Sequence, residues 1–371
     1  MKSEKSSMDR NITIRILAAV VLLCTLGHAT ARAQRERIRI DEDWQFALGN
    51  AASPEKDFGC GTEAFNYLTK AASVHNTGPY AAKFDATGWK RVDLPHDWAV
   101  DLPYAKEASH SHGYKTVGHK YPECSAGWYR KTIIIPETDL GKHISLQFDG
   151  IFRDSRIWVN GFYLGGEPSG YATQVYDISD YLNYGGENLI TVRADATLEE
   201  GWFYEGAGIY RHVWLNKMPP LHIAPFGTFV YSTLEEPYDQ ATLTIETKVE
   251  NSGLETVSSY RLRHTLLDAE GKKVSDCEQE GNPIKPKTSQ VNSIKLSVKN
   301  PKLWSVDTPY LYKVRTEVFR DGKLTDTYMT TIGIRDVKFD ADLGFFLNGK
   351  PLKLKGVNMH QDHAGVGSAL P

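Results

Sequence analysis

The sequence predicts an all-β protein of two consecutive β-sandwiches, followed by the opening of a third unit. Helical periodicity is nearly absent after residue 34, and short alternating or β-branched runs recur instead, separated by Gly, Asn, Asp and Pro. Val159-Asn160-Gly161-Phe162 is a hairpin signal of the strongest short-range kind. Strands at this spacing with polar turns are typical of sandwiches.

Composition limits the class of protein. A chain of 371 residues suits two or three domains, and 41% hydrophobic residues support a packed core rather than disorder. The formal charge of −3 leaves no basic footprint for nucleic acid. Aromatic residues reach 11%, which fits both a sugar-binding surface and, more commonly, an aromatic-rich β core.

Residues 1–33 are predicted to be a signal peptide. A positively charged start precedes the apolar run Ile16–Leu26, and Ala31-Arg32-Ala33 forms an A-x-A cleavage site. The apolar run is too short to span a bilayer. We therefore expect a periplasmic or secreted protein, cleaved after Ala33.

The cysteines of the mature chain allow at most one disulfide. Cys60, Cys124 and Cys277 remain after cleavage, and their number is odd. If a pair forms, we expect Cys60 with Cys124, since both lie in loop-like sequence of the first domain. No His/Cys spacing suggests zinc, so we expect no metal and no cofactor.

Residues 34–218 are predicted to form the first sandwich. Its strands are indicated by β-branched runs, namely 131–135, 144–148, 156–159, 189–192 and 213–215. A long Gly-, His- and Tyr-rich loop, Leu94–Gly127, interrupts them and contains His110, His112 and His119. A loop of this size is either functional or a solvated excursion, and both interpretations stay open.

Residues 219–332 are predicted to form an immunoglobulin-like sandwich. Pro219-Pro220 marks its beginning, and alternating runs follow at 241–250, 294–298 and 312–319. Asp321-Gly322 predicts another hairpin. The length and rhythm of this region fit a compact seven-strand sandwich.

Residues 333–371 begin with a hairpin and end in polar side chains. Phe345–Leu352 reads as the hairpin, and Pro351–Lys355 is predicted to be a short strand because Leu and Lys alternate there. It leads directly into a polar cluster with residues suited to hydrogen bonding, which consists of Asn358, His360, Gln361, Asp362 and His363.

Several stretches, taken in order, resemble a known enzyme family. They are Asp93–Trp98 (D-L-P-H-D-W), Gly127–Lys131, Phe148–Gly150, Trp158–Gly161, Gly206–Val213, Pro301–Ser305 and Lys355–His360. Each motif is weak alone, but the ordered set is very specific. It resembles glycoside hydrolase family 2, the family of β-galactosidases, β-glucuronidases and β-mannosidases, over nearly all of residues 36–371.

The resemblance implies an architecture and a mechanism. It implies a jelly-roll sugar-binding domain at 34–218, an immunoglobulin-like domain at 219–332, and the truncated start of a catalytic (β/α)8 barrel at 333–371. A full barrel needs ~250 residues. In this family a retaining mechanism uses two glutamates on later barrel strands. We therefore expect no catalytic residue within this chain, and an inactive chain in isolation.

The resemblance also implies a binding role for the polar cluster. Asn358, His360, Asp362 and His363 would follow the first barrel strand, at the face where barrel enzymes build their sites. Their imidazole, amide and carboxylate groups suit sugar hydroxyls, so we interpret them as substrate-binding residues. The alternative is that they are ordinary polar tail residues.

Two positions depart from the family pattern. Trp202 stands where relatives often place an aspartate that touches the sugar, and the region of Cys124 replaces an asparagine that some relatives use. The carboxylates of Glu199, Glu200 and Glu205 lie near the first of these positions. We expect no catalytic pair among them.

The His-x-Asp-His-x-Gly run at 360–365 resembles secreted bacterial β-galactosidase-type members, which favours terminal β-galactosides cleaved in carbohydrate catabolism. Two alternatives stay open. One is a non-catalytic carbohydrate-binding or scaffold protein of two sandwiches, and the other is a family member acting on β-glucuronides or β-mannosides. The expected partner is an oligosaccharide or glycan, with no nucleic acid and no membrane insertion. Homo-oligomerisation of the intact enzyme is left open.

Overall fold

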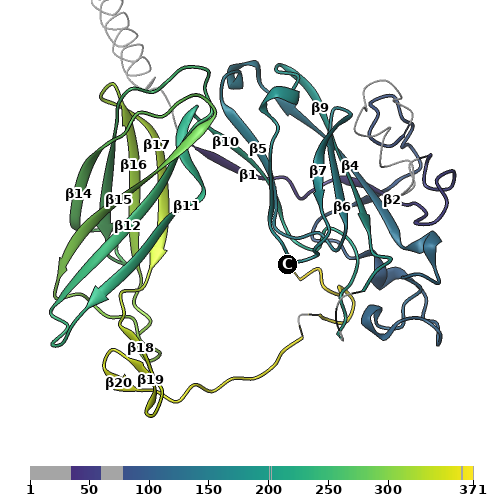
Figure 1. Ribbon diagram of the computed structural model, residues 1–371. Helices are drawn as coiled ribbons and strands as arrows, with labels where there is room; N and C mark the ends of the chain where they lie inside the picture. Colours follow the sequence, from purple (N-terminus) through teal and green to yellow (C-terminus); the bar gives the residue numbers. More distant parts are fainter. Residues whose placement is uncertain (1–34, 60–77, 200, 202, 361, 371) are drawn as a thin grey trace, which may run out of the picture. The chain divides into compact units, whose positions relative to one another are not determined.

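The computed structural model describes residues 35–59, 78–199, 201, 203–360 and 362–370 (Figure 1). The predicted signal peptide lies outside this part of the chain. The described residues form strands, turns and short 3-10 segments, without an α-helix among them. The predicted all-β class is confirmed.

The first sandwich consists of a six-stranded and a four-stranded antiparallel sheet. The larger sheet has the order β3 (Lys90–Val92), β2 (Trp44–Leu48), β4 (Ala126–Ile135), β9 (Gly186–Asp195), β6 (Ser155–Val159), β7 (Phe162–Glu167). The smaller has the order β1 (Glu36–Arg39), β10 (Val213–Met218), β5 (His143–Phe148), β8 (Gln174–Asp177). Strands distant in sequence pair within each sheet, as expected for a jelly roll.

The predicted hairpin at Asn160-Gly161 is confirmed. It joins β6 to β7, where Val159 pairs with Phe162. Asn160 and Gly161 have φ of 50° and 84°, the left-handed conformation that a two-residue hairpin turn requires. Asn160 also accepts a hydrogen bond from the backbone N–H of Leu189, which ties the turn to β9.

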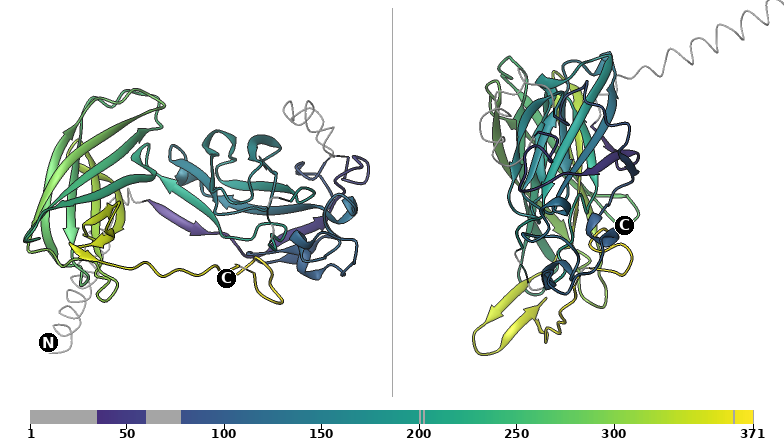
Figure 2. Two further views of the ribbon diagram at one scale, coloured as in Figure 1. Left: turned by 60° about the horizontal axis from the view of Figure 1, so that its bottom comes forward. Right: turned by 90° about the vertical axis from the view of Figure 1, so that its right-hand side faces the viewer.

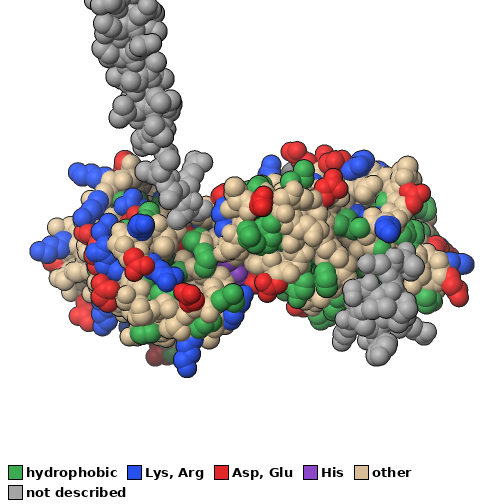
Figure 3. Space-filling view, turned by 90° about the horizontal axis from the view of Figure 1, so that it is seen from above, with side chains coloured by type: hydrophobic (Ala, Val, Ile, Leu, Met, Phe, Trp, Pro, Cys, Tyr) green, Lys and Arg blue, Asp and Glu red, His purple; other side chains and the backbone are tan. Residues whose placement is uncertain are grey.

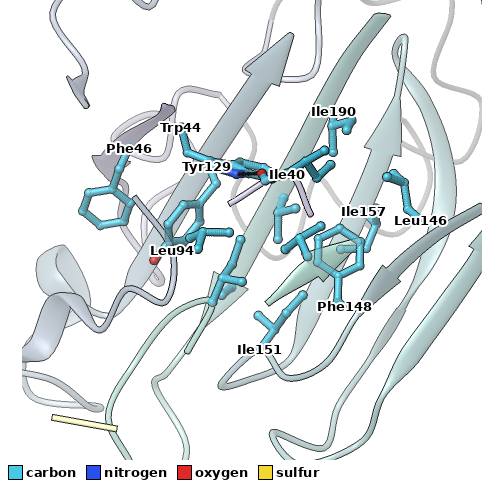
Figure 4. Packing of buried hydrophobic residues seen from close by; sticks show 14 of the residues in the cluster. Ile40, Trp44, Phe46, Leu94, Tyr129, Leu146, Phe148, Ile151, Ile157 and Ile190 are labelled. Atoms are coloured by element: carbon cyan, nitrogen blue, oxygen red, sulfur yellow. Dashed lines mark hydrogen bonds between the residues drawn. The ribbon is translucent and has the colours of Figure 1, made fainter. Parts of the chain in front are cut away.

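The core of this sandwich lies between its two sheets. Buried side chains from β4, β5, β6 and β9 point into it, and Figure 4 shows Phe148, Ile157 and Ile190 converging there. Side chains alternate across a strand, so the neighbours of these residues lie on the opposite face. Burial of this apolar surface is the main stabilising term.

The outer face of the six-stranded sheet is also covered. Trp128 of β4 stacks on Trp158 of β6 with ring centroids 5.6 Å apart, and Tyr80 stacks on Trp158 at 5.5 Å. Arg130 donates hydrogen bonds to the carbonyls of Ala81 and Phe84. The segment from residue 78 onwards therefore closes a second, smaller apolar cluster on this face.

A buried carboxylate supports the same face. Asp57 accepts hydrogen bonds from Trp128 Nε1 at 2.7 Å and from the Asn50 backbone, and it pairs with Arg193 Nε at 2.9 Å. Arg193 also pairs with Asp195. Burial raises the pKa of Asp57, and the nearby Arg193 charge opposes that rise. A buried ion pair of this kind is tolerated because its polar groups have partners.

The second sandwich is immunoglobulin-like and packs a three-stranded against a four-stranded sheet. The first has the order β11 (Leu221–Leu234), β12 (Gln240–Asn251), β15 (Thr288–Lys299). The second has the order β14 (Lys273–Gly281), β13 (Tyr260–Leu267), β16 (Tyr312–Arg320), β17 (Lys323–Ile332). Pro219 and Pro220 lie between β10 and β11, where proline ends one strand before the next begins.

A small sheet follows, and one predicted strand is wrong. β18 (Val337–Asp340), β19 (Gly344–Leu347) and β20 (Lys350–Pro351) form a three-stranded antiparallel sheet, in which β19 and β20 are the predicted hairpin. The predicted strand Pro351–Lys355 is reduced to the last residue of β20, and the chain then runs on without strand structure (Figure 2). A strand needs a hydrogen-bonded neighbour, and beyond the Leu352 N–H, which bonds to the Phe345 carbonyl, no described strand pairs with 353–360. The side chain of Val357 is 93% exposed.

The long loop Leu94–Gly127 is packed in part against the core of the first sandwich. It contains three 3-10 segments, η2 (Trp98–Asp101), η3 (His110–His112) and η4 (Pro122–Cys124). Two further 3-10 segments, η5 (Glu137–Asp139) and η6 (Ser179–Tyr181), lie elsewhere in the sandwich. Within the loop, Trp98, His112 and Val117 are buried. The loop is therefore anchored by its buried side chains, while other residues of it, among them Tyr104 and Tyr114, are exposed.

The pairing of Cys60 with Cys124 that the sequence favours, if a disulfide forms, involves a residue outside the described part of the chain. Cys124 and Cys277 both carry free thiols, and Cys60 lies outside the described residues. Burial raises the pKa of the Cys277 thiol to about 11, which makes it a poor nucleophile. Cys277 lies on β14, where it faces His264 across the strand pair.

We predict that limited trypsin digestion cuts first at Lys353 and Lys355. Both side chains are exposed, and the backbone there lies outside the sheets, so a protease can bind it in extended form. Peptide mass mapping over time checks this. Lys131 in β4 is the internal comparison, and cleavage there before the tail is cut would contradict the fold.

We predict that the immunoglobulin-like sandwich loses stability in acid through His264. The ring is buried, Nδ1 lies 3.1 Å from Thr316 Oγ1, and burial lowers its pKa to about 4. The unfolded state then binds the proton first, so stability is full above about pH 6.5 and falls towards about pH 4. Urea unfolding at about pH 7.5 and about pH 5 should show a loss of about 2 kcal/mol that His264→Leu removes. The exposed His119→Leu is the matched control; an equal effect of both contradicts the assignment.

Candidate substrate-binding region

A buried carboxylate joins the first sandwich to the end of the chain. Asp97 directly precedes η2, and its side chain caps that segment by accepting a hydrogen bond from the Ala99 N–H at 3.1 Å. The same oxygen, Oδ1, accepts a second bond from the Ala207 N–H at 2.9 Å. Both donors to Oδ1 thus lie in the first sandwich. The two hydrogen bonds tie the 94–127 loop to the segment that precedes β10.

The other oxygen of Asp97 bonds to residues 363–370, which we call the tail. Oδ2 accepts hydrogen bonds from Tyr204 Oη at 2.8 Å, from the Ser368 N–H at 3.0 Å and from Ser368 Oγ at 3.1 Å. Residues 367–369 are buried. The tail forms a compact turn, in which His363 and Gly367 exchange backbone hydrogen bonds of 2.8 and 3.0 Å.

Two glycines allow this close approach. Gly206 has φ of +71° and Gly367 has φ of +60°, and an added Cβ on either would overlap Asp97 Oδ2. A Cβ on Gly206 would also overlap Ser368 Oγ. Both positions combine a left-handed backbone with lack of space, so only glycine is compatible with the docked turn.

The environment fixes the protonation of Tyr204. Burial raises its pKa, and the Asp97 carboxylate raises it further. Tyr204 therefore stays protonated at neutral pH and donates its hydrogen to Asp97. Burial also raises the pKa of Asp97, and the hydrogen bonds from Ser368 and Tyr204 act against that rise by stabilising the charged form.

The predicted binding residues lie next to this junction, and all four are exposed. The imidazole of His360 contacts the Phe203 ring edge-on, with centroids 5.6 Å apart. Asp362 lies close enough to Tyr204 for its negative charge to raise the Tyr204 pKa. His363 Nδ1 lies 2.9 Å from the Ala364 carbonyl. Asn358 lies in the extended segment before them.

The acidic residues before Gly206 have structural partners. Glu199 accepts a hydrogen bond from Ser109 Oγ. Glu205 is buried and accepts one from Tyr171 Oη at 3.4 Å. Glu200 and Trp202, the departure from the family pattern, lie outside the described residues. The described residues of this region therefore offer hydrogen-bond donors and acceptors that can bind a ligand.

Two cavities adjoin the region. One of about 240 Å³ lies beside Ser368, and its lining comprises Pro95, Asp149, Tyr210, Arg211, His212, Ser368 and Leu370. A second of about 310 Å³ lies under the loop and includes His112, Val117, Tyr121 and Glu199. No group of three or more His, Cys, Asp or Glu side chains among the described residues could hold a metal ion.

Sequence reasoning missed Asp97, Tyr204 and Ser368 as partners. Asp97 was recognised only as part of the D-L-P-H-D-W motif, and nothing in sequence spacing connects it to a residue 271 positions later. The available signal was indirect, because glycines at 206 and 367 stand in segments that no turn pattern explains.

The surface carries both signs of charge. On the face shown in Figure 3, Lys and Arg side chains are interspersed with Asp and Glu.

Within the described part of the chain, the structure contains no helix with the length and apolar character of a membrane span.

Comparison with known proteins gives the family. Residues 39–219 match the family model "Glycosyl hydrolases family 2, sugar binding domain", and residues 221–335 match "Glycosyl hydrolases family 2". The β-galactosidase BoGH2A of Bacteroides ovatus is 35% identical over 340 residues, which cover 91% of this chain and 36% of that protein. A putative β-glucuronidase of Formosa agariphila is 32% identical over 356 residues, covering 95% and 30%.

A solved structure agrees with the sequence comparison. The crystal structure of a glycosyl hydrolase family 2 member from Bacteroides cellulosilyticus superimposes with a TM-score of 0.76 at 31% identity, covering 90% of this chain and 40% of that one. This chain spans about a third of the length of the curated relatives it matches. With two family models matching in order over both sandwiches, the chain belongs to glycoside hydrolase family 2.

Proposed function

We propose that this chain supplies the substrate-positioning front portion of a hydrolase that cleaves terminal β-galactosides. The observation that carries the proposal is the location of His360 and Asp362 beside Phe203 and Tyr204 of the sugar-binding domain. The similarity to the β-galactosidase of Bacteroides ovatus over 91% of the chain supports the sugar class.

The chemistry of these groups suits a sugar. An imidazole and a carboxylate both form directional hydrogen bonds with hydroxyls, and an aromatic ring such as Phe203 offers an apolar face to a pyranose. Because the hydroxyl at one ring carbon changes orientation between sugars, fixed donors and acceptors discriminate between them. Binding groups held by two segments of the chain keep such a geometry better than groups on one flexible loop.

Bond cleavage is assigned to residues outside this chain. A retaining glycosidase needs one carboxyl as acid/base and a second as nucleophile, about 5–5.5 Å apart. We propose that both are glutamates in the portion of the relatives that this chain does not cover. The role of the described residues is then to bind and orient the sugar and to limit access of water.

A β-glucuronide is the second candidate substrate. Two relatives from Formosa agariphila bear β-glucuronidase names, at 32% and 30% identity. A glucuronide carboxylate requires a cationic partner, and Arg211 lines the cavity beside Ser368. We also propose that the protein is exported, on the basis of the leader predicted at residues 1–33.

We predict that the enzyme carrying this chain and a barrel hydrolyses an aryl β-galactoside at least tenfold faster than the matching β-glucuronide, while the 371-residue chain alone hydrolyses neither. Release of the chromophore is followed for both substrates and both proteins. Preference for the glucuronide overturns the sugar assignment. Activity of the isolated chain that a substitution within it abolishes overturns the assignment of the carboxylates.

We predict that His360→Ala in the enzyme with the barrel lowers kcat/KM for the galactoside by about tenfold or more. Loss of a hydrogen bond that leaves a buried group unpaired costs about 1–3 kcal/mol. Steady-state kinetics check this, and His119→Ala, another exposed histidine of the same domain, is the matched control. Wild-type kinetics for His360→Ala would remove this residue from the site.

A further inference from the structure

We propose that Asp97 is a positioning residue, whose buried carboxylate fastens residues 363–370 to the sugar-binding sandwich and thereby places His360 and Asp362 for substrate. The proposal goes beyond the sugar class, and its kinetic part rests on the proposed function. Asp97 does not contact the sugar in this scheme. It acts through the segment that it holds.

The two oxygens of Asp97 divide their partners between the two segments. Oδ1 accepts only from the sandwich, through the Ala99 and Ala207 backbones. Oδ2 accepts from both the N–H and the Oγ of Ser368, and from Tyr204. Hydrogen bonds to an ionised acceptor are stronger than neutral ones. One buried charge therefore stabilises the loop cap and the docked tail together.

The position of the segment between β20 and the tail depends on the contacts made at its two ends. Leu352 N–H bonds to the Phe345 carbonyl, and the next backbone-to-backbone bond among the described residues is that of His363 with Gly367. Between them the chain is exposed. Fixing such a segment costs conformational entropy at every residue. Interactions at the far end, where Ser368 meets Asp97, must therefore offset that cost.

Shape supports the same role. Gly206 of the sandwich and Gly367 of the tail both lie against Asp97, and neither position has room for a Cβ. Tyr204 Oη also lies near the position that a Cβ on Gly367 would occupy, at 2.7 Å. The sandwich and the tail are thus complementary around one carboxylate. A cap for η2 alone would need only Oδ1 and would set no steric demand on residue 367.

The first test measures docking without any substrate. Hydrogen exchange of the 371-residue chain is followed by mass spectrometry in peptides covering 363–370 and β4. Asp97→Asn places an N–H₂ group opposite the Ser368 donor, and Gly367→Ala removes the space on the tail side only. Both should speed exchange in 363–370 by about tenfold or more, because a hydrogen bond to a charged group is stronger than one between neutral groups.

The matched control is Asp57→Asn. Asp57 is also a buried, hydrogen-bonded aspartate of the same sandwich, but its partners are Trp128, Arg193 and Asn50. Asp57→Asn should speed exchange in β4 and leave tail exchange near the wild-type rate, so that the ratio of tail to β4 protection stays at or above the wild-type value. Unchanged tail exchange in Gly367→Ala, which leaves the cap of η2 in place, overturns the docking role even if Asp97→Asn fails to fold.

The second test measures positioning in the enzyme with the barrel. Gly367→Ala and Asp97→Asn should lower kcat/KM about tenfold, chiefly through KM, whereas Asp57→Asn should leave KM near wild type at temperatures where it is folded. Faster tail exchange with unchanged KM overturns the positioning role. If the enzyme cleaves no galactoside, the proposed function fails, and the exchange experiment still decides whether Asp97 holds the tail.

Discussion

The carboxylate of Asp97 joins parts of the chain that lie far apart in sequence. A buried negative charge is unfavourable unless donors surround it, and here they come from three segments: the turn that begins at Ala99, the stretch from Tyr204 to Ala207, and Ser368. Each segment satisfies a group that would otherwise be unpaired. Loss of one therefore affects the others, because the remaining donors no longer offset desolvation of the charge.

The rigidity needed for this junction comes from the sheet behind it. β4 is buried on both faces, with Tyr129 in the sandwich core and Trp128 in the outer cluster. Asp57 and Arg193 add a buried ion pair on the outer face. Trp98, immediately after Asp97, is itself buried and donates from Nε1 to the Cys124 carbonyl at 2.9 Å. Asp97 thus stands on a loop that is tied to a well-packed strand.

Under the proposed function, this arrangement separates the groups that bind the sugar from the groups that cleave the bond. Two of the described carboxylates near the junction are engaged, Asp97 by backbone and hydroxyl donors and Glu205 by Tyr171. The exposed groups that follow the extended segment, His360 and Asp362, are free to meet a ligand. Under the proposed function, exposed groups at this place would set substrate preference independently of the groups that cleave the bond. The mixture of galactosidase and glucuronidase names among the relatives is consistent with such variation.

Local sequence determined the elements of this protein, and tertiary structure decided the site. Alternating β-branched runs and the Asn160-Gly161 turn predicted the strands and a hairpin, because side-chain period and turn conformation are local properties. The same local pattern wrongly extended a strand through Lys355, since pairing depends on a neighbour that sequence does not show. Packing of the 94–127 loop was also beyond local reasoning. The contact of Asp97 with Ser368 spans 271 positions, and only the fold brings such distant donors around one buried charge.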